Sequence, residues 1–226
     1  WMRTHNMHLD AAQGDRRAYP RALVLFARAP ERGRVKTRLA AGLGDDAALA
    51  IYVRLAERAG AAAREVRDCR RVVAYTPAHD GVASAMRTWL GADFAYEPQC
   101  DGDLGRRMAG AVGHCLAGGA ERVVVIGTDC PDLETGLLEE AFAALDVAEL
   151  VFGPAEDGGY YLIGVRAVQP VLFEQIPWSS PDTLARSLGA ARAAGLSVHL
   201  LRTLADIDTA DDWQRWCSRG ALGARE

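Results

Sequence analysis

The sequence predicts an α/β protein with a mostly parallel central sheet that is covered by helices on both faces. From Tyr19 onward, short apolar segments alternate with longer amphipathic ones, which is typical of strands joined by helical crossovers. Residues 123–126 (Val-Val-Val-Ile) lack polar alternation, as expected of a central strand that is buried on both faces. A Gly-Gly pair between aromatic-containing segments at 152–154 and 160–161 predicts a tight turn and a small antiparallel element.

Each predicted element follows from its local pattern. The short apolar segments are the predicted strands, at residues 22–28, 71–76, 94–97, 122–127, 150–153, 160–165 and 197–201. The amphipathic segments between them are the predicted helices, at residues 45–65, 81–90, 104–117, 134–145, 170–174, 181–194 and 210–218. Asp45 or Asp46 is the expected cap of the first long helix, and Pro181 with Asp182 opens a later one. The pattern predicts one domain at 21–219, between a flexible N-terminal tail at 1–20 and a C-terminal tail at 220–226.

Composition excludes several classes of protein. The chain has 226 residues, of which 50% are hydrophobic, and a net charge of -4, which argues against a nucleic-acid coat or a polybasic membrane anchor. The five cysteines are odd in number and none forms a CxxC pair, which predicts reduced thiols in a cytoplasmic protein. No apolar segment approaches the roughly 18 residues that a membrane span requires. We therefore expect neither nucleic acid nor membrane as a partner.

The loop after the first predicted strand contains Lys36, the only lysine beside 25 arginines. Lysine is a compact point charge, whereas arginine is a planar fork, so a single lysine suggests a site that requires an ammonium group. Glycine-containing basic loops after strands often hold phosphates. We expect Ala27, Arg28, Gly33, Lys36, Thr37 and Arg38 to form such a cradle. A solvated basic loop is the alternative, since neither a P-loop nor a GxGxxG motif is present.

Asp129 follows the most buried predicted strand, in Gly127-Thr128-Asp129. A carboxylate there is costly to bury unless it is paired or binds a metal. Magnesium is typically held by one or two carboxylates together with substrate phosphates. Asp129 is therefore the predicted ligand of Mg²⁺ or Mn²⁺, with Thr128 beside the phosphates and either Asp206 or Asp208 as the second carboxylate. A simple turn cap at Asp129 is the alternative.

Two further segments are candidate parts of the site. Asp157 precedes Gly158, Gly159 and Tyr160, a pattern in which the glycines admit a substrate close to the backbone and the tyrosine stacks on a ring. Asp157 is the candidate base, although a hairpin turn with solvated acids would have the same pattern. Asp103 is the expected cap of a helix whose early Arg107 opposes the helix dipole and suggests an anion, with a solvent-facing charge as the alternative.

Several of these motifs, in this order, resemble a known family. They are Phe-Ala-Arg-Ala-Pro at 26–30, Gly-Arg-Val-Lys-Thr-Arg-Leu at 33–39, Gln99, Asp-Leu-Gly-Arg-Arg-Met at 103–108, Gly-Thr-Asp-Cys-Pro at 127–131, Gly-Pro-Ala-Glu-Asp-Gly-Gly-Tyr-Tyr-Leu-Ile-Gly at 153–164, Ile-Pro-Trp-Ser at 176–179 and Asp-Ile-Asp-Thr at 206–209. The chain resembles the bacterial family of domain of unknown function 2064, glycosyltransferase-like relatives of 2-phospho-L-lactate guanylyltransferase. The resemblance implies the GT-A, or nucleotide-diphospho-sugar transferase, fold with a nucleotide-activated donor and a divalent metal. In that fold the metal is usually held by an Asp after the central strand, here Asp129.

The expected function is that of a metal-dependent transferase that uses a nucleoside triphosphate or a nucleotide sugar as donor and a small molecule as acceptor. In nucleotidyl transfer, Lys36 and Arg38 would stabilise the leaving pyrophosphate. In glycosyl transfer, a nucleoside diphosphate leaves and either Asp157 or Glu156 would serve as base. The basic loop favours the first chemistry and the carboxylates near Tyr160 favour the second. A non-catalytic nucleotide-binding module that serves a partner protein is the alternative.

Overall fold

The computed structural model describes residues 19–174, 176–178 and 180–219. The predicted tails lie outside the described residues apart from positions 19 and 20, and so does Ser179 of the Ile-Pro-Trp-Ser motif.

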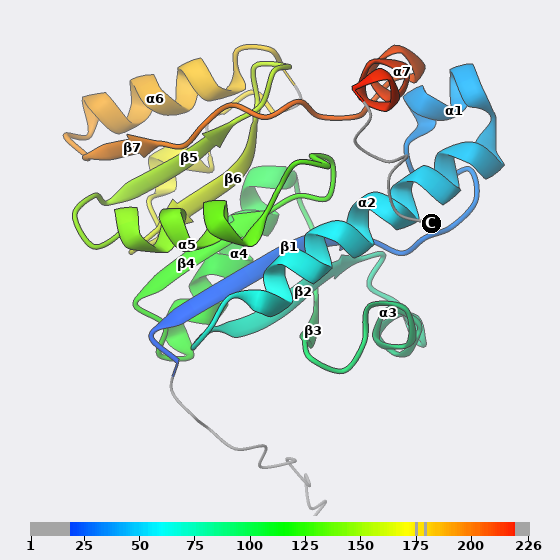
Figure 1. Cartoon of the computed structure of the whole chain (residues 1–226). Coiled ribbons are helices and arrows are strands. Elements are labelled where there is room, and N and C mark those ends of the chain that lie inside the picture. Colours follow the sequence, from blue (N-terminus) through cyan, green and yellow to red (C-terminus); the bar gives the residue numbers. More distant parts are fainter. Residues whose placement is uncertain (1–18, 175, 179, 220–226) are drawn as a thin grey trace, which may run out of the picture.

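The centre of the protein is a seven-stranded sheet, as the sequence predicts (Figure 1). Its strands are β1 (Arg21–Arg28), β2 (Arg70–Thr76), β3 (Ala95–Pro98), β4 (Arg122–Ile126), β5 (Leu150–Pro154), β6 (Tyr160–Val165) and β7 (Val198–Leu200), in the spatial order β3-β2-β1-β4-β6-β5-β7. Strand β6 runs antiparallel to both of its neighbours, β4 and β5, whereas the other pairs are parallel. The antiparallel element is thus confirmed, and it lies inside the sheet.

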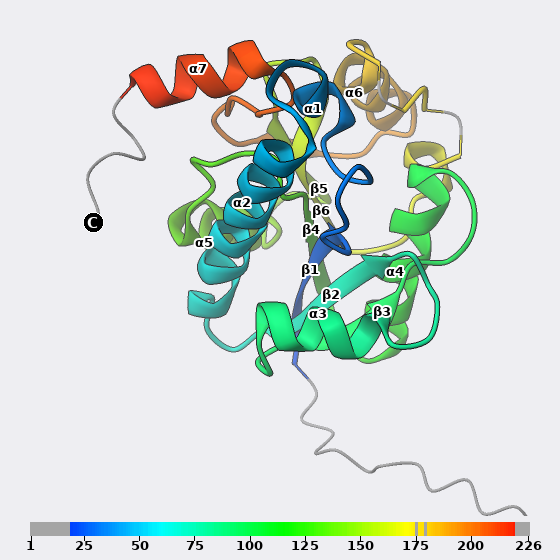
Figure 2. The ribbon, with the colours of Figure 1, turned by 90° about the vertical axis from the view of Figure 1, so that its right-hand side faces the viewer.

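Helices cover both faces of the sheet because alternate residues of each strand point to opposite faces. On one face, Leu23 and Leu25 of β1 belong to the core that includes α2 (Asp45–Glu65), α3 (Val82–Leu90) and α5 (Thr135–Ala144). On the other face, Ala22 and Val24 belong to the core that includes α4 (Leu104–Ala117), the short 3-10 helix η1 (Pro170–Leu172) and α6 (Thr183–Ala193). Figure 2 shows α2 and α5 on one side of the strands and α4 on the other.

Helix α1 (Thr37–Leu43) is absent from the sequence prediction, which places a loop there. The segment has no side-chain cap and follows a residue in a left-handed conformation, so its local signals are weak. It is stabilised by tertiary contact instead: Leu39 is fully buried in a cluster with Ile51 of α2, Ile207, and Trp216 of α7 (Ala210–Ser218). This packing brings the C-terminal segment against the loop that follows β1.

The expected helix caps are partly confirmed. The Asp103 side chain accepts a hydrogen bond from the Arg106 backbone N–H. Asp182 occupies the cap position of α6, but its side chain makes no capping hydrogen bond. At the start of α7, Thr209 forms a capping box with Asp212. The prediction for α2 is wrong by one residue, because Gly44 occupies the cap position and Asp45 opens the first turn. A glycine is suited to this position because its φ is 83°.

Candidate active site at the carboxyl end of the sheet

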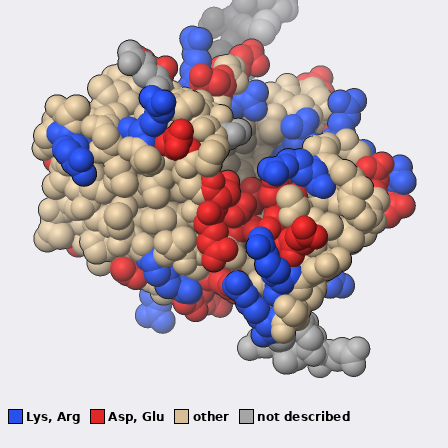
Figure 3. Space-filling view, turned by 90° about the horizontal axis from the view of Figure 1, so that it is seen from above, with Lys and Arg blue, Asp and Glu red and all other residues tan. Residues whose placement is uncertain are grey.

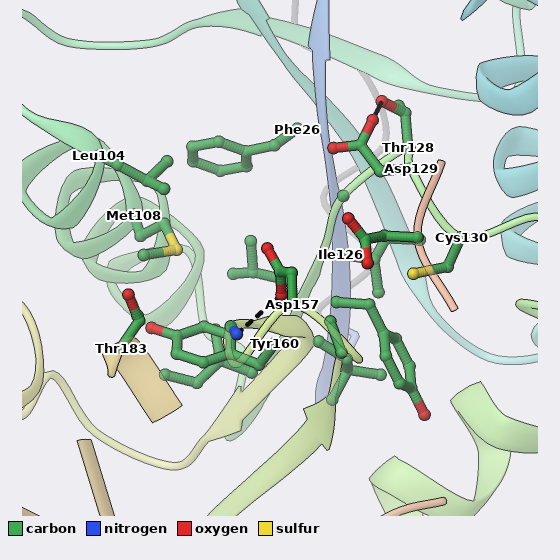
Figure 4. Close-up of a pocket in the computed structure, with 18 of the residues that line it drawn as sticks. Phe26, Leu104, Met108, Ile126, Thr128, Asp129, Cys130, Asp157, Tyr160 and Thr183 are labelled. Carbon is green, nitrogen blue, oxygen red and sulfur yellow. Dashed lines mark hydrogen bonds between the residues drawn. The ribbon is translucent and has the colours of Figure 1, made fainter. Parts of the chain in front are cut away.

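A cavity lies where β1 and β4 end, which is where parallel sheets bind ligands. Its volume is about 340 Å³. Because β6 is antiparallel, its first residue, Tyr160, also lies at this edge. Helix α4 contributes Leu104 and Met108 to the wall, and the segment before α6 contributes Trp178. Figure 4 shows Leu104 and Met108 on one side of the cavity and the carboxylate of Asp129 on the other.

Lys36 links three segments that are far apart in the sequence. Its Nζ lies 2.6 Å from Oδ1 of Asp129 and donates a hydrogen bond of 2.5 Å to the backbone carbonyl of Ile207. The Lys36 side chain is only 6% exposed, whereas that of Asp129 is 53% exposed. The backbone N–H of Ile207 in turn donates to the carbonyl of Asp129. The ammonium therefore joins the first loop, the end of β4 and the late acidic segment.

The backbone at Lys36 is left-handed, with φ 47° and ψ 48°. Residues other than glycine rarely adopt this conformation, which costs roughly 1–2 kcal/mol. The conformation turns the chain from the loop into α1 and directs the lysine side chain into the protein. Backbone strain of this kind is often found at functional sites.

Three carboxylates, those of Asp129, Asp157 and Asp206, line the same cavity. Burial, followed by the charges of Asp157 and Asp129, raises the pKa of Asp206 to about 6. Among the described residues, no group of three or more His, Cys, Asp and Glu side chains lies close enough together to hold a metal ion. Carboxylate oxygens are nevertheless the ligands that Mg²⁺ prefers, and such sites are commonly completed by substrate phosphates. Asp129, Asp157 and Asp206 thus offer carboxylate oxygens of the kind that such a cation prefers.

Arg38 and Asp208 lie in a second recess, of about 320 Å³, beside the first. Nη1 of Arg38 lies 2.5 Å from Oδ2 of Asp208, and the arginine side chain is 73% exposed. Asp157 and Asp206 line both recesses, whereas Asp208 lines the second alone. This placement favours Asp206 over Asp208 as the partner of Asp129. Seen from above, Asp and Glu side chains gather in the middle of the molecule, with Lys and Arg side chains beside them (Figure 3).

The other residues of the predicted phosphate cradle differ in their exposure to solvent. Ala27 is 3% exposed and belongs to the core, so only its backbone is available to a ligand. Arg28, Gly33 and Thr37 are exposed. The hydroxyl of Tyr52, which sequence analysis did not identify, accepts from the backbone N–H of Arg28 and donates to its carbonyl, both at 2.7 Å. Tyr52 thereby fixes the end of β1.

Two of the predicted phosphate-binding residues have structural contacts. The Asp103 carboxylate is engaged in capping α4, and Nε of Arg107 donates to the carbonyl of Gly102 at 2.9 Å. Thr128, another predicted phosphate-binding residue, is 6% exposed, and its hydroxyl lies 3.4 Å from Oδ1 of Asp129. Thr128 thus lies beside the acidic site, and α4 borders the cavity through Leu104.

The predicted substrate-binding turn has a defined geometry. Gly158 has φ 87°, and a Cβ there would lie 2.0 Å from the carbonyl oxygen of Pro181. The Gly159 N–H donates to Oδ1 of Asp157 at 2.8 Å, which orients the candidate base. The ring of Tyr160 lies 5.0 Å from Phe152 and 6.3 Å from Trp178. Burial raises the pKa of the Tyr160 hydroxyl, so this side chain is a neutral phenol.

Sequence analysis did not identify the apolar wall of the cavity, which includes Phe26, Met108 and Trp178. Each lies in a quoted motif, but nothing local marks it as a binding residue. Cys130 also lines the cavity, and burial raises the pKa of its thiol. It is therefore a neutral thiol and not an activated nucleophile.

No helix in the described part of the chain is long and apolar enough to cross a membrane.

None of the curated proteins matches the sequence. Solved structures do match. A Desulfovibrio desulfuricans protein, provisionally named a nucleotide-diphospho-sugar transferase, is similar at 30% identity with a TM-score of 0.85 over 91% of this chain and 89% of that protein.

More distant structures share the fold. A CMP:2-keto-3-deoxy-manno-octonic acid synthetase solved with CTP has a TM-score of 0.53 at 15% identity, over 90% of this chain and 99% of that one. A Mycobacterium tuberculosis protein solved with manganese has a TM-score of 0.52 at 18% identity, over 88% of this chain and 97% of that one. The expected nucleotide-diphospho-sugar transferase fold is confirmed. Residues 59–180 match the family model described as an uncharacterized protein conserved in bacteria, and the chain therefore belongs to this family, DUF2064.

Proposed function

We propose that the protein is a divalent-metal-dependent transferase that moves a group from a nucleotide-activated donor to a hydroxyl of a small acceptor. The observation that supports this most directly is the ion pair between the buried Lys36 and the half-exposed Asp129 at the carboxyl edge of the sheet, beside Asp157 and Asp206. The named functions of the structural neighbours, which include nucleotide-sugar and cytidylyl transfer, are consistent with it.

The chain's own residues divide the work between holding the donor and activating the acceptor. Asp129 and Asp206 would hold the cation, which supplies Lewis-acid stabilisation of the donor's phosphate oxygens. Lys36 fixes the position of Asp129 through their ion pair and ties it to the carbonyl of Ile207. Exposed cations at Arg28 and Arg34 face solvent beside the same edge and are available to the rest of the donor.

Asp157 is the proposed base. It lies in the wall shared by both recesses and is oriented by the Gly159 N–H. As the acceptor oxygen bonds to the electrophilic centre of the donor, its proton moves to the Asp157 carboxylate. The bond from the donor centre to the leaving phosphate oxygen breaks, and the nucleotide departs with the electron pair.

The geometry favours glycosyl over nucleotidyl transfer. Lys36 is paired with Asp129 and Ile207, and Arg38 is paired with Asp208, so the two cations expected to stabilise a leaving pyrophosphate are engaged. A nucleoside diphosphate requires less neutralisation than a triphosphate does, and the carboxylates that line the cavity suit an acceptor hydroxyl. Release of a nucleoside diphosphate is thus the expected outcome.

A thermal-shift panel tests the proposal. The four ribonucleoside triphosphates and the UDP-, GDP- and CDP-sugars are added with Mn²⁺, with Mg²⁺ or without metal. A donor at about 100-fold its dissociation constant should add about 2.7 kcal/mol of stability. Asp129→Asn should abolish the metal-dependent part, whereas Asp211→Asn, which removes an exposed carboxylate in α7, should not. The absence of stabilisation by every donor would refute the proposal, and stabilisation by triphosphates alone would favour nucleotidyl transfer.

A further inference from the structure

The cavity at the carboxyl edge has a polar end and an apolar end. Asp129, Asp157 and Asp206 lie at the polar end. The apolar end is formed by Phe26 of β1, Leu104 and Met108 of α4, and Tyr160 of β6 (Figure 4), together with Trp178. A ligand that fills it must therefore present different chemistry at its two ends.

The apolar end is built from side chains that hold one another in place. Tyr160 packs edge-on against Trp178 with ring centroids 6.3 Å apart, and against Phe152 at 5.0 Å. A Cβ at Gly105 would lie 2.6 Å from Nε1 of Trp178, so the indole lies directly against the first turn of α4. Such a preformed aromatic wall favours a planar or apolar group, because little side-chain entropy is lost on binding.

The charged side chains that line the cavity are all acidic. None of the described residues that line the cavity is Lys, Arg or His, whereas three are Asp. The nearest buried cation, Lys36, is already paired with Asp129. A cation held by Asp129 and Asp206 would offset two of these charges and would be shared with the donor's phosphates, which are themselves anionic. An anionic acceptor inside the cavity would therefore meet repulsion from Asp157 and from the donor, and none of the described residues that line the cavity carries a positive charge to offset it.

We propose that the cavity selects an uncharged acceptor that has a hydroxyl at one end and a planar or apolar group at the other. This inference rests on the proposed function, because it assigns the acceptor of the same site. The apolar group lies against Phe26, Met108 and Tyr160, and the hydroxyl reaches Asp157, which takes its proton. A volume of about 340 Å³ limits the part that is enclosed to a small molecule.

The test compares two probes that differ only at C6, where phenyl glucoside has a hydroxymethyl group and phenyl glucuronide has a carboxylate. Ligand-observed NMR titration with and without Mn²⁺ measures binding directly and needs no turnover. Leu104→Arg introduces a cation at the mouth of the cavity, where Leu104 is 42% exposed and the fold should tolerate it. Leu200→Arg in β7 is the matched control, since Leu200 is 48% exposed and does not line the cavity.

The glucoside is expected to bind at least tenfold more tightly than the glucuronide, and Leu104→Arg should reduce this ratio at least threefold while Leu200→Arg leaves it unchanged. Equal affinity for both probes, no binding of either at millimolar concentration, or an unchanged ratio in Leu104→Arg would overturn the inference. Donor stabilisation in the thermal-shift panel is a separate measurement. Failure there would refute the transferase proposal, whereas failure of the NMR test alone would leave that proposal standing and remove the acceptor assignment.

Discussion

Replacing Lys36 with methionine should destabilise the protein even without any ligand. Methionine keeps the unbranched stem in the buried position but removes the ammonium. The carbonyl of Ile207, a residue that is 1% exposed, then loses its 2.5 Å hydrogen bond. An unsatisfied buried acceptor costs about 1–3 kcal/mol. Asp129 loses an ion pair, but its side chain is 53% exposed and water can replace the partner, so this adds at most about 1 kcal/mol.

The expected loss of stability for Lys36→Met is therefore about 2–3 kcal/mol, or roughly 5–10 °C in Tm for a chain of this size. Urea unfolding of the metal-free protein, followed by circular dichroism and tryptophan fluorescence, measures it. Arg38→Met is the matched control two residues away. Arg38 is 73% exposed and pairs with Asp208, so its loss should cost less than about 1 kcal/mol.

Equal effects of the two substitutions would refute the reasoning, because burial is the property that distinguishes the two cations. A change below about 0.5 kcal/mol in Lys36→Met would do the same, since it would mean that the contact with Ile207 contributes nothing.

Three further outcomes are expected. Burial and neighbouring charge raise the pKa of Asp206 to about 6, so between about pH 4 and 6 the folded state binds a proton that the unfolded state lacks, and stability falls as pH rises through this window. Asp206→Asn should therefore raise Tm more at pH 8 than at pH 4, relative to the unmodified protein at the same pH. An equal gain in Tm at both pH values would contradict the raised pKa. Gly158→Ala should lower the free energy of unfolding by at least about 2 kcal/mol, because φ is 87° and the new Cβ would meet the Pro181 carbonyl. Gly189→Ala in α6, where nothing lies within 4 Å of the new Cβ, should raise the free energy of unfolding by about 0.5–1 kcal/mol. Chemical denaturation of both variants measures these changes. Asp129→Asn should remove the Mn²⁺-dependent stabilisation by the donor, measured by differential scanning fluorimetry, while the far-UV circular dichroism spectrum stays unchanged. If the stabilisation of this variant still depended on Mn²⁺, Asp129 would be excluded as a metal ligand.

Local patterns in the sequence were sufficient to predict most elements of the fold. The unbroken apolar run at residues 123–126 predicts a buried central strand, and β4 is completely buried at these positions. The cap at Asp103 was also predictable, because a capping side chain bonds to a backbone group within three residues of itself. Helix α1 was not, because it depends on the burial of Leu39 against Trp216, which is far away in the sequence.

The candidate site divides in the same way. The sequence by itself determined that acidic and basic residues follow strand ends, and because such ends meet at one edge of a parallel sheet, Lys36, Asp129 and Asp157 were predicted from pattern. Only the tertiary structure decided that Lys36 is buried and paired with Asp129, that Asp206 lines the same cavity while Asp208 pairs with Arg38, and that Phe26, Met108 and Trp178 form one wall. The physical reason is that ion pairing, burial and shape depend on which distant segments pack together, and a pattern of neighbouring residues holds no information on those distances.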